Sequence, residues 1–138
     1  MPAKDAFHDL VVKALQNGGW TITHDPYRIE LEFTDLCVDL GAERILGATK
    51  GNEKIAIEIK SFLAASKISE FHTAVGQFIN YKIALEDYEP DRKLYLAVPF
   101  SIHSRFFSYP FIQKVVTRNQ VPLLIYDDNQ PEIRLWKG

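Results

Sequence analysis

The sequence is poor in the features that mark secreted, zinc-binding and membrane-spanning proteins. Its single cysteine, Cys37, excludes an internal disulfide, and no Cys/His spacing fits a zinc site. No apolar run approaches the roughly 18 residues of a membrane span. The first residues, Met-Pro-Ala-Lys-Asp, lack the apolar segment of a signal peptide. We therefore expect a cytoplasmic protein that does not enter a membrane.

An excess of positive charge is also missing. The chain carries 16 Lys and Arg against 18 Asp and Glu, a formal net charge of −2. A protein that coats DNA would be clearly basic, so this class is disfavoured, but DNA as a substrate is not excluded because charge can be distributed unevenly. The stretch from residue 44 to residue 67 contains five basic residues and only two acidic residues. The five are Arg44, Lys50, Lys54, Lys60 and Lys67.

The remaining composition is that of an ordinary soluble globular protein. Hydrophobic residues make up 46% of the chain and charged residues 25%. A length of 138 residues is enough to bury a core but short for two domains. We therefore expect one domain over residues 1–138.

The most informative stretch is 53–62, Glu-Lys-Ile-Ala-Ile-Glu-Ile-Lys-Ser-Phe. Isoleucines at every second position predict a β-strand with one buried face. The other face carries Glu58 and Lys60, and because they are two residues apart on a strand they lie side by side. Upstream, Asp39 is a lone acid inside the apolar run Val38-Asp39-Leu40.

These residues together predict a metal-dependent phosphodiesterase site. If the strand of Asp39 pairs with strand 53–60, Asp39 and Glu58 can bind one hard cation, Mg²⁺ or Mn²⁺, with Lys60 beside it. The alternative is that Glu58 and Lys60 merely face water, and an isolated Glu-x-Lys favours it because short motifs match by chance. The acid upstream and the polar-faced helix that follows favour the site.

The order of the predicted elements indicates the fold class. Helices are expected at 5–17, from residue 66 or 69 to 86, and at 111–119. Strands are expected at 20–24, 91–98, 121–126 and 132–136, and a short edge strand within 28–36. A meander of strands is expected over 38–60, with a turn at 50–53. Residues 100–109 are expected to be irregular, with about one helical turn. This order predicts an α/β (α+β) fold: a mixed β-sheet flanked by helices, with an αβββαβ core and a C-terminal strand hairpin.

The long helix carries a second candidate group. Phe71, Val75 and Phe78 lie on one apolar stripe, which we expect to face the core. Gln77 and Tyr81 are four residues apart and share another face, which we expect to turn toward the Asp39–Glu58 site. The alternative is a Gln and a Tyr at an ordinary helix surface.

The layout resembles the restriction-endonuclease-like, PD-(D/E)XK nuclease superfamily. The matching residues are Asp39 and Glu58-Ile59-Lys60, with Val38 where the motif name has proline. Gln77 to Tyr81 resembles the Gln-x-x-x-Tyr motif of the RecB-like branch. The resemblance implies that Asp39, Glu58 and the Ile59 carbonyl hold the cation. It also implies that Lys60 positions water or neutralises charge on the phosphate, and that Gln77 and Tyr81 orient Lys60 or a phosphate oxygen.

Nearly the whole chain resembles the XisH family, the fdxN element excision controlling factors found mainly in cyanobacteria. The resemblance is carried by Pro2-Ala3-Lys4-Asp5 with Phe7-His8, 19–26, 38–43, 58–62 and 76–81. It implies a role in programmed excision of a DNA element, beside a site-specific recombinase and a small partner protein, XisI. A second copy of the chain is a further candidate partner.

Three functions stay open at this stage. The first is a metal-dependent DNA endonuclease that acts in excision. The second is a catalytically silent module on a nuclease scaffold, which binds DNA or the recombinase; the modest net charge favours it slightly. The third is a restriction- or toxin-like nuclease kept silent by its small partner. A missing Asp39, Glu58 or Lys60 would have excluded catalysis, but all three are present.

Overall fold

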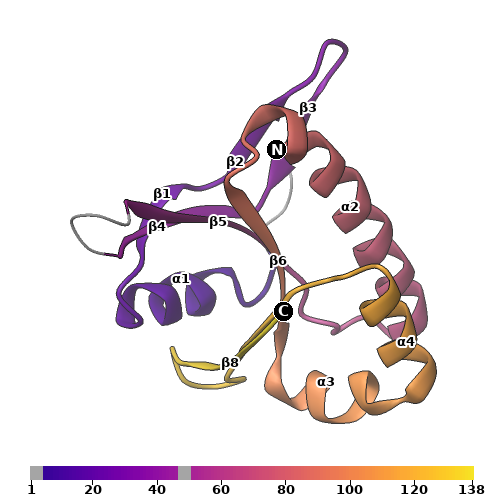
Figure 1. Ribbon diagram of the computed structural model, residues 1–138. Helices are drawn as coiled ribbons and strands as arrows, with labels where there is room; N and C mark the ends of the chain where they lie inside the picture. Colours follow the sequence, from indigo (N-terminus) through magenta and orange to yellow (C-terminus); the bar gives the residue numbers. More distant parts are fainter. Residues whose placement is uncertain (1–4, 47–50) are drawn as a thin grey trace.

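A mixed β-sheet runs through the centre of the protein, as the computed structural model shows for residues 5–46 and 51–138 (Figure 1). In the described part of the chain, six strands form this sheet in the order β1-β4-β5-β6-β7-β8, and β2 and β3 form a separate hairpin. The elements are α1 His8–Asn17, β1 Thr21–His24, β2 Tyr27–Glu30, β3 Asp35–Val38, β4 Leu40–Ile45, β5 Asn52–Ile59, α2 Lys67–Tyr88, β6 Arg92–Pro99, α3 Phe100–Arg105, the 3-10 helix Phe106–Ser108, α4 Pro110–Arg118, β7 Leu123–Tyr126 and β8 Ile133–Lys137.

Strand β5 lies where the sheet changes from antiparallel to parallel pairing. It pairs antiparallel with β4 and parallel with β6, β6 pairs parallel with β7, and β7 and β8 close the chain as an antiparallel hairpin. Parallel neighbours need a crossover connection, which α2 provides between β5 and β6. The expected mixed sheet, its αβββαβ order and its C-terminal strand hairpin are therefore confirmed.

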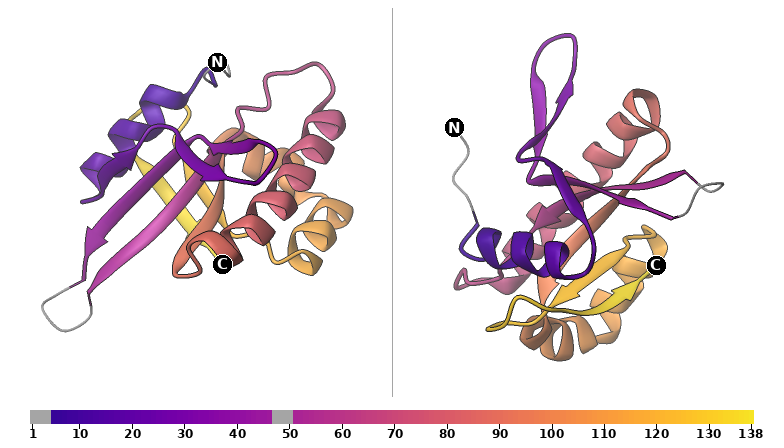
Figure 2. Two further views of the ribbon diagram at one scale, coloured as in Figure 1. Left: turned by 90° about the horizontal axis from the view of Figure 1, so that it is seen from above. Right: turned by 90° about the vertical axis from the view of Figure 1, so that its left-hand side faces the viewer.

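Helices cover both faces of the sheet. Helix α1 lies on one face, and α2 and α4 lie on the other (Figure 2). The alternation in β5 assigns its side chains to these two layers, since Ile55, Ile57 and Ile59 pack in the cluster with α1 residues and Ala56 packs in the cluster with α2 residues. Glu58 follows the parity of Ala56, so it points to the α2 side.

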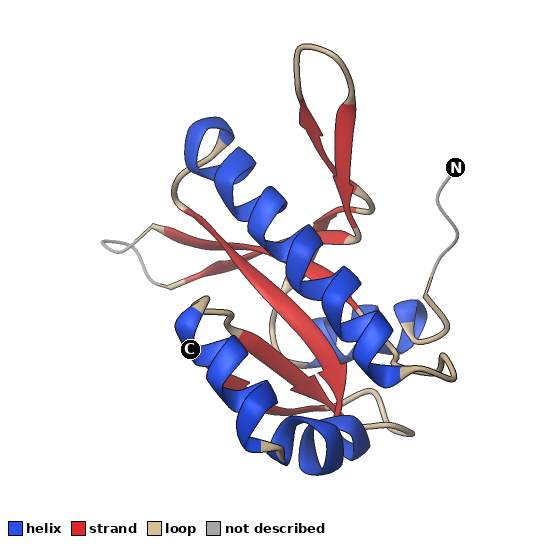
Figure 3. Cartoon of the chain, turned by 90° about the vertical axis from the view of Figure 1, so that its right-hand side faces the viewer, coloured by secondary structure: helices blue, strands red, loops and turns tan. Residues whose placement is uncertain are grey.

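Helix α2 spans the second face diagonally (Figure 3). It begins after Ser66, whose hydroxyl accepts a 3.2 Å hydrogen bond from the Ser69 N–H and so caps the first turn. Its buried side chains recur every three or four residues; they are Phe71, Ala74, Phe78, Tyr81 and Leu85. Phe71 and Phe78 face the core as expected and Val75 packs half-buried against it, but Tyr81, expected on a separate face, also belongs to the core cluster.

The chain between β1 and β4 differs from the sequence prediction. The predicted short edge strand within 28–36 is two strands, β2 and β3, whose hairpin projects from the body of the protein (Figure 3). Asp39 lies in the bend between β3 and β4 and not inside a strand, because the chain there leaves the hairpin and enters the large sheet.

Smaller differences concern loops and ends. Residues 100–108 form α3 and a 3-10 turn, a longer helical segment than predicted. Helix α1 begins at His8, later than the expected start at residue 5, and the first residue of the predicted turn at 50–53, Lys50, lies outside the described residues. Among the helices of the described ranges, none combines the length and apolar character that crossing a membrane requires.

The central strand should dominate stability. We expect Ile57→Ala to lower the free energy of unfolding by about 2 to 5 kcal/mol, because Ile57 is fully buried and truncation leaves a cavity in the sheet. Ile83→Ala is the matched control, since Ile83 is exposed on α2 and should change stability by less than about 0.5 kcal/mol. Urea denaturation measures both; equal losses would contradict this core assignment.

Candidate active site

Two acids from adjacent segments meet at the carboxyl end of β5. Asp39 Oδ2 accepts a 2.7 Å hydrogen bond from the Ile59 N–H, and Glu58 Oε1 accepts a 3.3 Å hydrogen bond from the Asp39 N–H. Each side chain thus binds the backbone of the other's segment. Asp39 and Glu58 are the next residues beyond the antiparallel pairing of β4 with β5, in which Leu40 pairs with Ile57. The structure therefore brings the two predicted acids together.

Lys60 completes the predicted group of three. Its Nζ lies 3.6 Å from Glu58 Oε2, and both side chains are mostly buried, with 18% and 7% exposed. The lysine and the glutamate share one face of the strand end, as their spacing predicts. An ammonium held beside two carboxylates leaves the group with one net negative charge when all three are ionised.

Burial changes how the acids titrate. Loss of hydration, the nearby negative charge of Asp39 and a hydrogen bond to its carboxyl group raise the pKa of Glu58 to about 8, although Lys60 opposes this. Burial also raises the pKa of Asp39, while the hydrogen bond from the Ile59 N–H acts in the other direction. The surroundings of the pair therefore oppose the ionisation of both carboxyl groups at once.

The donor atoms fit one hard divalent cation. Carboxylate oxygens are the ligands that Mg²⁺ and Mn²⁺ prefer, and a bound cation would offset the repulsion between two buried carboxylates. Over residues 5–46 and 51–138, no group of three or more His, Cys, Asp or Glu side chains could hold a metal. Asp39 and Glu58 would thus hold it alone among side chains, with the Ile59 carbonyl as the predicted third ligand and water or phosphate completing the shell.

Tyr81 reaches this region from α2, and Gln77 lies one helical turn before it. Burial, together with the nearby negative charges of Glu58 and Asp39, raises the pKa of Tyr81 to about 12, so its hydroxyl stays protonated. Gln77 is half-buried, and its Oε1 is buried without a hydrogen-bond partner among the described residues. Neither residue faces bulk solvent. Their roles in orienting Lys60 or a phosphate stay predictions.

His8 is a site neighbour that the sequence analysis did not single out. His8 is only 4% exposed, its Nε2 lies within hydrogen-bond distance of Asp25 Oδ1 at 2.8 Å, and its electrostatic influence lowers the pKa of Asp39. A signal was present, because His8 lies three and seven residues before Val11 and Leu15 on the buried stripe of α1. Asp9, the acid next to it, is exposed.

Two further carboxylates fix the segment that follows Lys60. Asp5 Oδ2 accepts from the Ser61 N–H at 3.0 Å, and Glu70 accepts from the Phe62 N–H at 2.5 Å. Phe62 has a φ of 56°, a conformation that non-glycine residues rarely adopt, and its ring is fully buried. These contacts hold Lys60 from its C-terminal side.

Close packing around Gly41 requires a residue without a side chain. The pairing of β1 with β4 is irregular there, and a Cβ on Gly41 would meet Tyr27 Cδ2 at 2.9 Å and His24 Cβ at 3.1 Å. The protein's own side chains therefore occupy that space. Cys37, on β3, is half-buried and lies near Tyr81.

Comparisons with known proteins agree over nearly the full length. A family model described as "XisH protein" matches residues 1–134. A solved XisH family protein from Nostoc punctiforme PCC 73102 is 47% identical, with a TM-score of 0.88 over 97% of this chain and 100% of that one. A solved fdxN element excision controlling factor protein from Anabaena variabilis is also 47% identical, with a TM-score of 0.88 over 98% and 100%. No curated protein matched.

The acid pair should make stability depend on pH. Glu58 ionises near pH 4.5 when unfolded and near pH 8 when folded, so between these values the folded state binds the extra proton and loses stability as pH rises. In EDTA we expect a decrease of about 2 to 4 kcal/mol between pH 5 and pH 9, measured by urea denaturation. Glu58→Gln should flatten this decrease, and Glu86→Gln, an exposed control, should not. A steep decrease that survives in Glu58→Gln would contradict the assignment.

Proposed function

The chain belongs to the XisH family, and on that premise we propose that it is a metal-dependent DNA endonuclease that acts in the excision of a DNA element. The observation that carries the nuclease assignment is the convergence of Asp39, Glu58 and Lys60 at one strand end. The excision role rests on the likeness to the Anabaena variabilis protein, which is described as an fdxN element excision controlling factor. The mixed sheet with this acid pair supports placing the fold among the restriction-endonuclease-like PD-(D/E)XK nucleases.

The proposed reaction is hydrolysis of a phosphodiester. Water attacks phosphorus, the bond to one ester oxygen breaks, and that oxygen leaves with a proton. A Mg²⁺ or Mn²⁺ ion held by Asp39, Glu58 and the Ile59 carbonyl would polarise the phosphate and make the bound water more acidic. Lys60 stabilises negative charge that develops on the phosphoryl oxygens, and its mostly buried position strengthens that interaction.

Tyr81 and Gln77 are proposed to position the substrate. The Tyr81 hydroxyl keeps its proton well above neutral pH, so it can donate a hydrogen bond to a phosphate oxygen or a water. Gln77 has a buried Oε1 without a partner among the described residues, which leaves it able to accept a hydrogen bond from water or Lys60. We further propose a site-specific recombinase and an XisI-like small protein as partners in excision.

A catalytically silent DNA- or recombinase-binding module is the second candidate. It is favoured by the backbone hydrogen bonds that the two acids already make, because Asp39 accepts from the Ile59 N–H and Glu58 accepts from the Asp39 N–H. A formal net charge of −2 also gives DNA little general attraction. The two candidates differ in whether the acid pair binds a divalent cation.

Lysine removal tests the chemistry. We expect Lys60→Ala to abolish Mg²⁺- or Mn²⁺-dependent cleavage of supercoiled plasmid, because the negative charge that develops on the phosphoryl oxygens loses the Lys60 ammonium group. A gel assay with and without the partner protein measures the cleavage. Lys114→Ala, an exposed lysine on α4, is the matched control and should cut like wild type. If Lys60→Ala also cuts like wild type, the activity comes from another site or a contaminant.

Metal binding tests the acid pair separately. We expect calorimetry at pH 8 to show one divalent-cation site in wild type and none in Asp39→Asn or Glu58→Gln, because each change removes a charged oxygen ligand. The amide of Asp39→Asn retains an acceptor for the Ile59 N–H, so the bend should survive. Asp9→Asn, an exposed acid on α1, is the control. A wild type that binds no cation and cuts no DNA would establish the silent module instead.

A further inference from the structure

Two surface features lie outside the proposed site and have opposite charge. The first is the acidic arm, the β2–β3 hairpin of residues 27–38, which carries three acids, Glu30, Glu32 and Asp35, against one arginine, Arg28. The second is the basic pocket, a cavity of about 1090 Å³ between α2, the α3–α4 segment and the ends of β6, β7 and β8.

The acidic arm has a fixed base and an exposed apolar tip. At the base, Ile29 is fully buried, and the Tyr27 ring packs edge-on against Tyr88 and below the Arg92 guanidinium. At the tip, which a 2.8 Å hydrogen bond from the Leu31 N–H to the Thr34 carbonyl closes, Phe33 is 81% exposed. A hairpin with a buried base that presents a phenylalanine to water has the form of a docking element.

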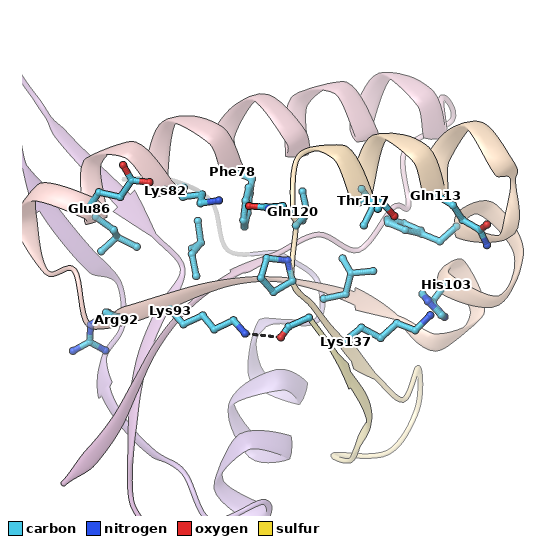
Figure 4. Close-up of a pocket in the computed structure, with 18 of the residues that line it drawn as sticks. Phe78, Lys82, Glu86, Arg92, Lys93, His103, Gln113, Thr117, Gln120 and Lys137 are labelled. Atoms are coloured by element: carbon cyan, nitrogen blue, oxygen red, sulfur yellow. Dashed lines mark hydrogen bonds between the residues drawn. The ribbon is translucent and has the colours of Figure 1, made fainter. Parts of the chain in front are cut away.

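The basic pocket has an apolar floor and lysines at its edge. Figure 4 shows Lys82 reaching in from α2, with Lys93 and Lys137 along the opposite side. Lys93 donates to the Gly138 carbonyl, but neither Lys82 nor Lys137 has an ion-pair partner within the described ranges. Glu86 is the one acidic side chain of the lining. The floor is formed by Phe78, Leu85, Leu94, Phe107, Val121 and Leu123.

We propose that the acidic arm of one copy of this chain docks into the basic pocket of a second copy. Phe33 would enter the apolar floor while Glu30 and Glu32 meet Lys82 and Lys137 at the edge. The volume of about 1090 Å³ lies just above the roughly 300–1,000 Å³ of small-molecule sites, so the pocket has room for a hairpin tip.

The arm cannot fill the pocket of its own chain. Figure 1 shows the hairpin tip directed away from α4 and the C-terminus, which border the pocket, and the buried base holds it in that direction. Because every copy carries both features, two copies can exchange arms reciprocally. Such an exchange is a closed two-fold dimer, whereas one-way docking would continue into an open chain. The inference does not depend on nuclease chemistry.

Charge reversal on each side provides the test. The arm variant is Glu30→Lys with Glu32→Lys, and the pocket variant is Lys82→Glu with Lys137→Glu. Each variant alone places like charges in contact, so sedimentation equilibrium should show association weakened at least about tenfold relative to wild type. An equimolar mixture should regain dimers, since a lysine arm then meets a glutamate pocket and the reverse pairing is the native one.

Phe33→Ala tests the apolar contact and should also weaken association, while Phe111→Ala, an exposed phenylalanine on α4 outside the pocket, should not. Circular dichroism checks that each variant is folded. A wild type that stays monomeric up to about 100 μM would overturn the proposal. So would charge variants that associate like wild type, or a mixture that stays monomeric. None of these outcomes bears on cleavage or cation binding.

Discussion

The reciprocal hydrogen bonds between Asp39 and the end of β5 are the contacts on which the arrangement of this protein depends. Asp39 lies where the chain leaves the projecting hairpin for the large sheet, and its carboxylate holds the Ile59 N–H there. The Asp39 N–H in turn fixes the Glu58 carboxylate. Folding thus brings two acids together inside the protein. The same two bonds position a strand junction and create a group that favours positive charge.

A buried arginine supports the opposite end of the same strands. Arg92 is 5% exposed and donates to the Ile55 carbonyl at 2.8 Å and to Glu89 at 2.8 Å. Its interactions hold the pKa of Glu89 at about 2, with further help from Tyr27 and Lys54. A buried cation with these partners is well compensated. Because Tyr27 begins the hairpin, this network also explains how two strands outside the large sheet keep a fixed position.

Sequence periodicity was enough for most of the fold but not for the full surroundings of the site. Alternating isoleucines identified β5 and the face of Glu58, and helical spacing identified the buried stripe of α2. The bend at Asp39 was missed because apolar neighbours on both sides look like continuous strand. The proximity of His8 depends on how α1 packs, which local spacing does not determine. The basic pocket joins residues from both halves of the chain, so no single segment encodes it.

The position of the single cysteine gives this protein a built-in chemical reporter. Cys37 is half-buried on β3, two residues before Asp39, and lies near Tyr81. A thiol reagent therefore has one point of attachment, at the edge of the acid pair. The rate at which a small reagent modifies that thiol measures how freely solvent reaches the site. Occupancy of the site by a cation, DNA or protein can thus be followed by labelling kinetics, without introducing a probe by mutation.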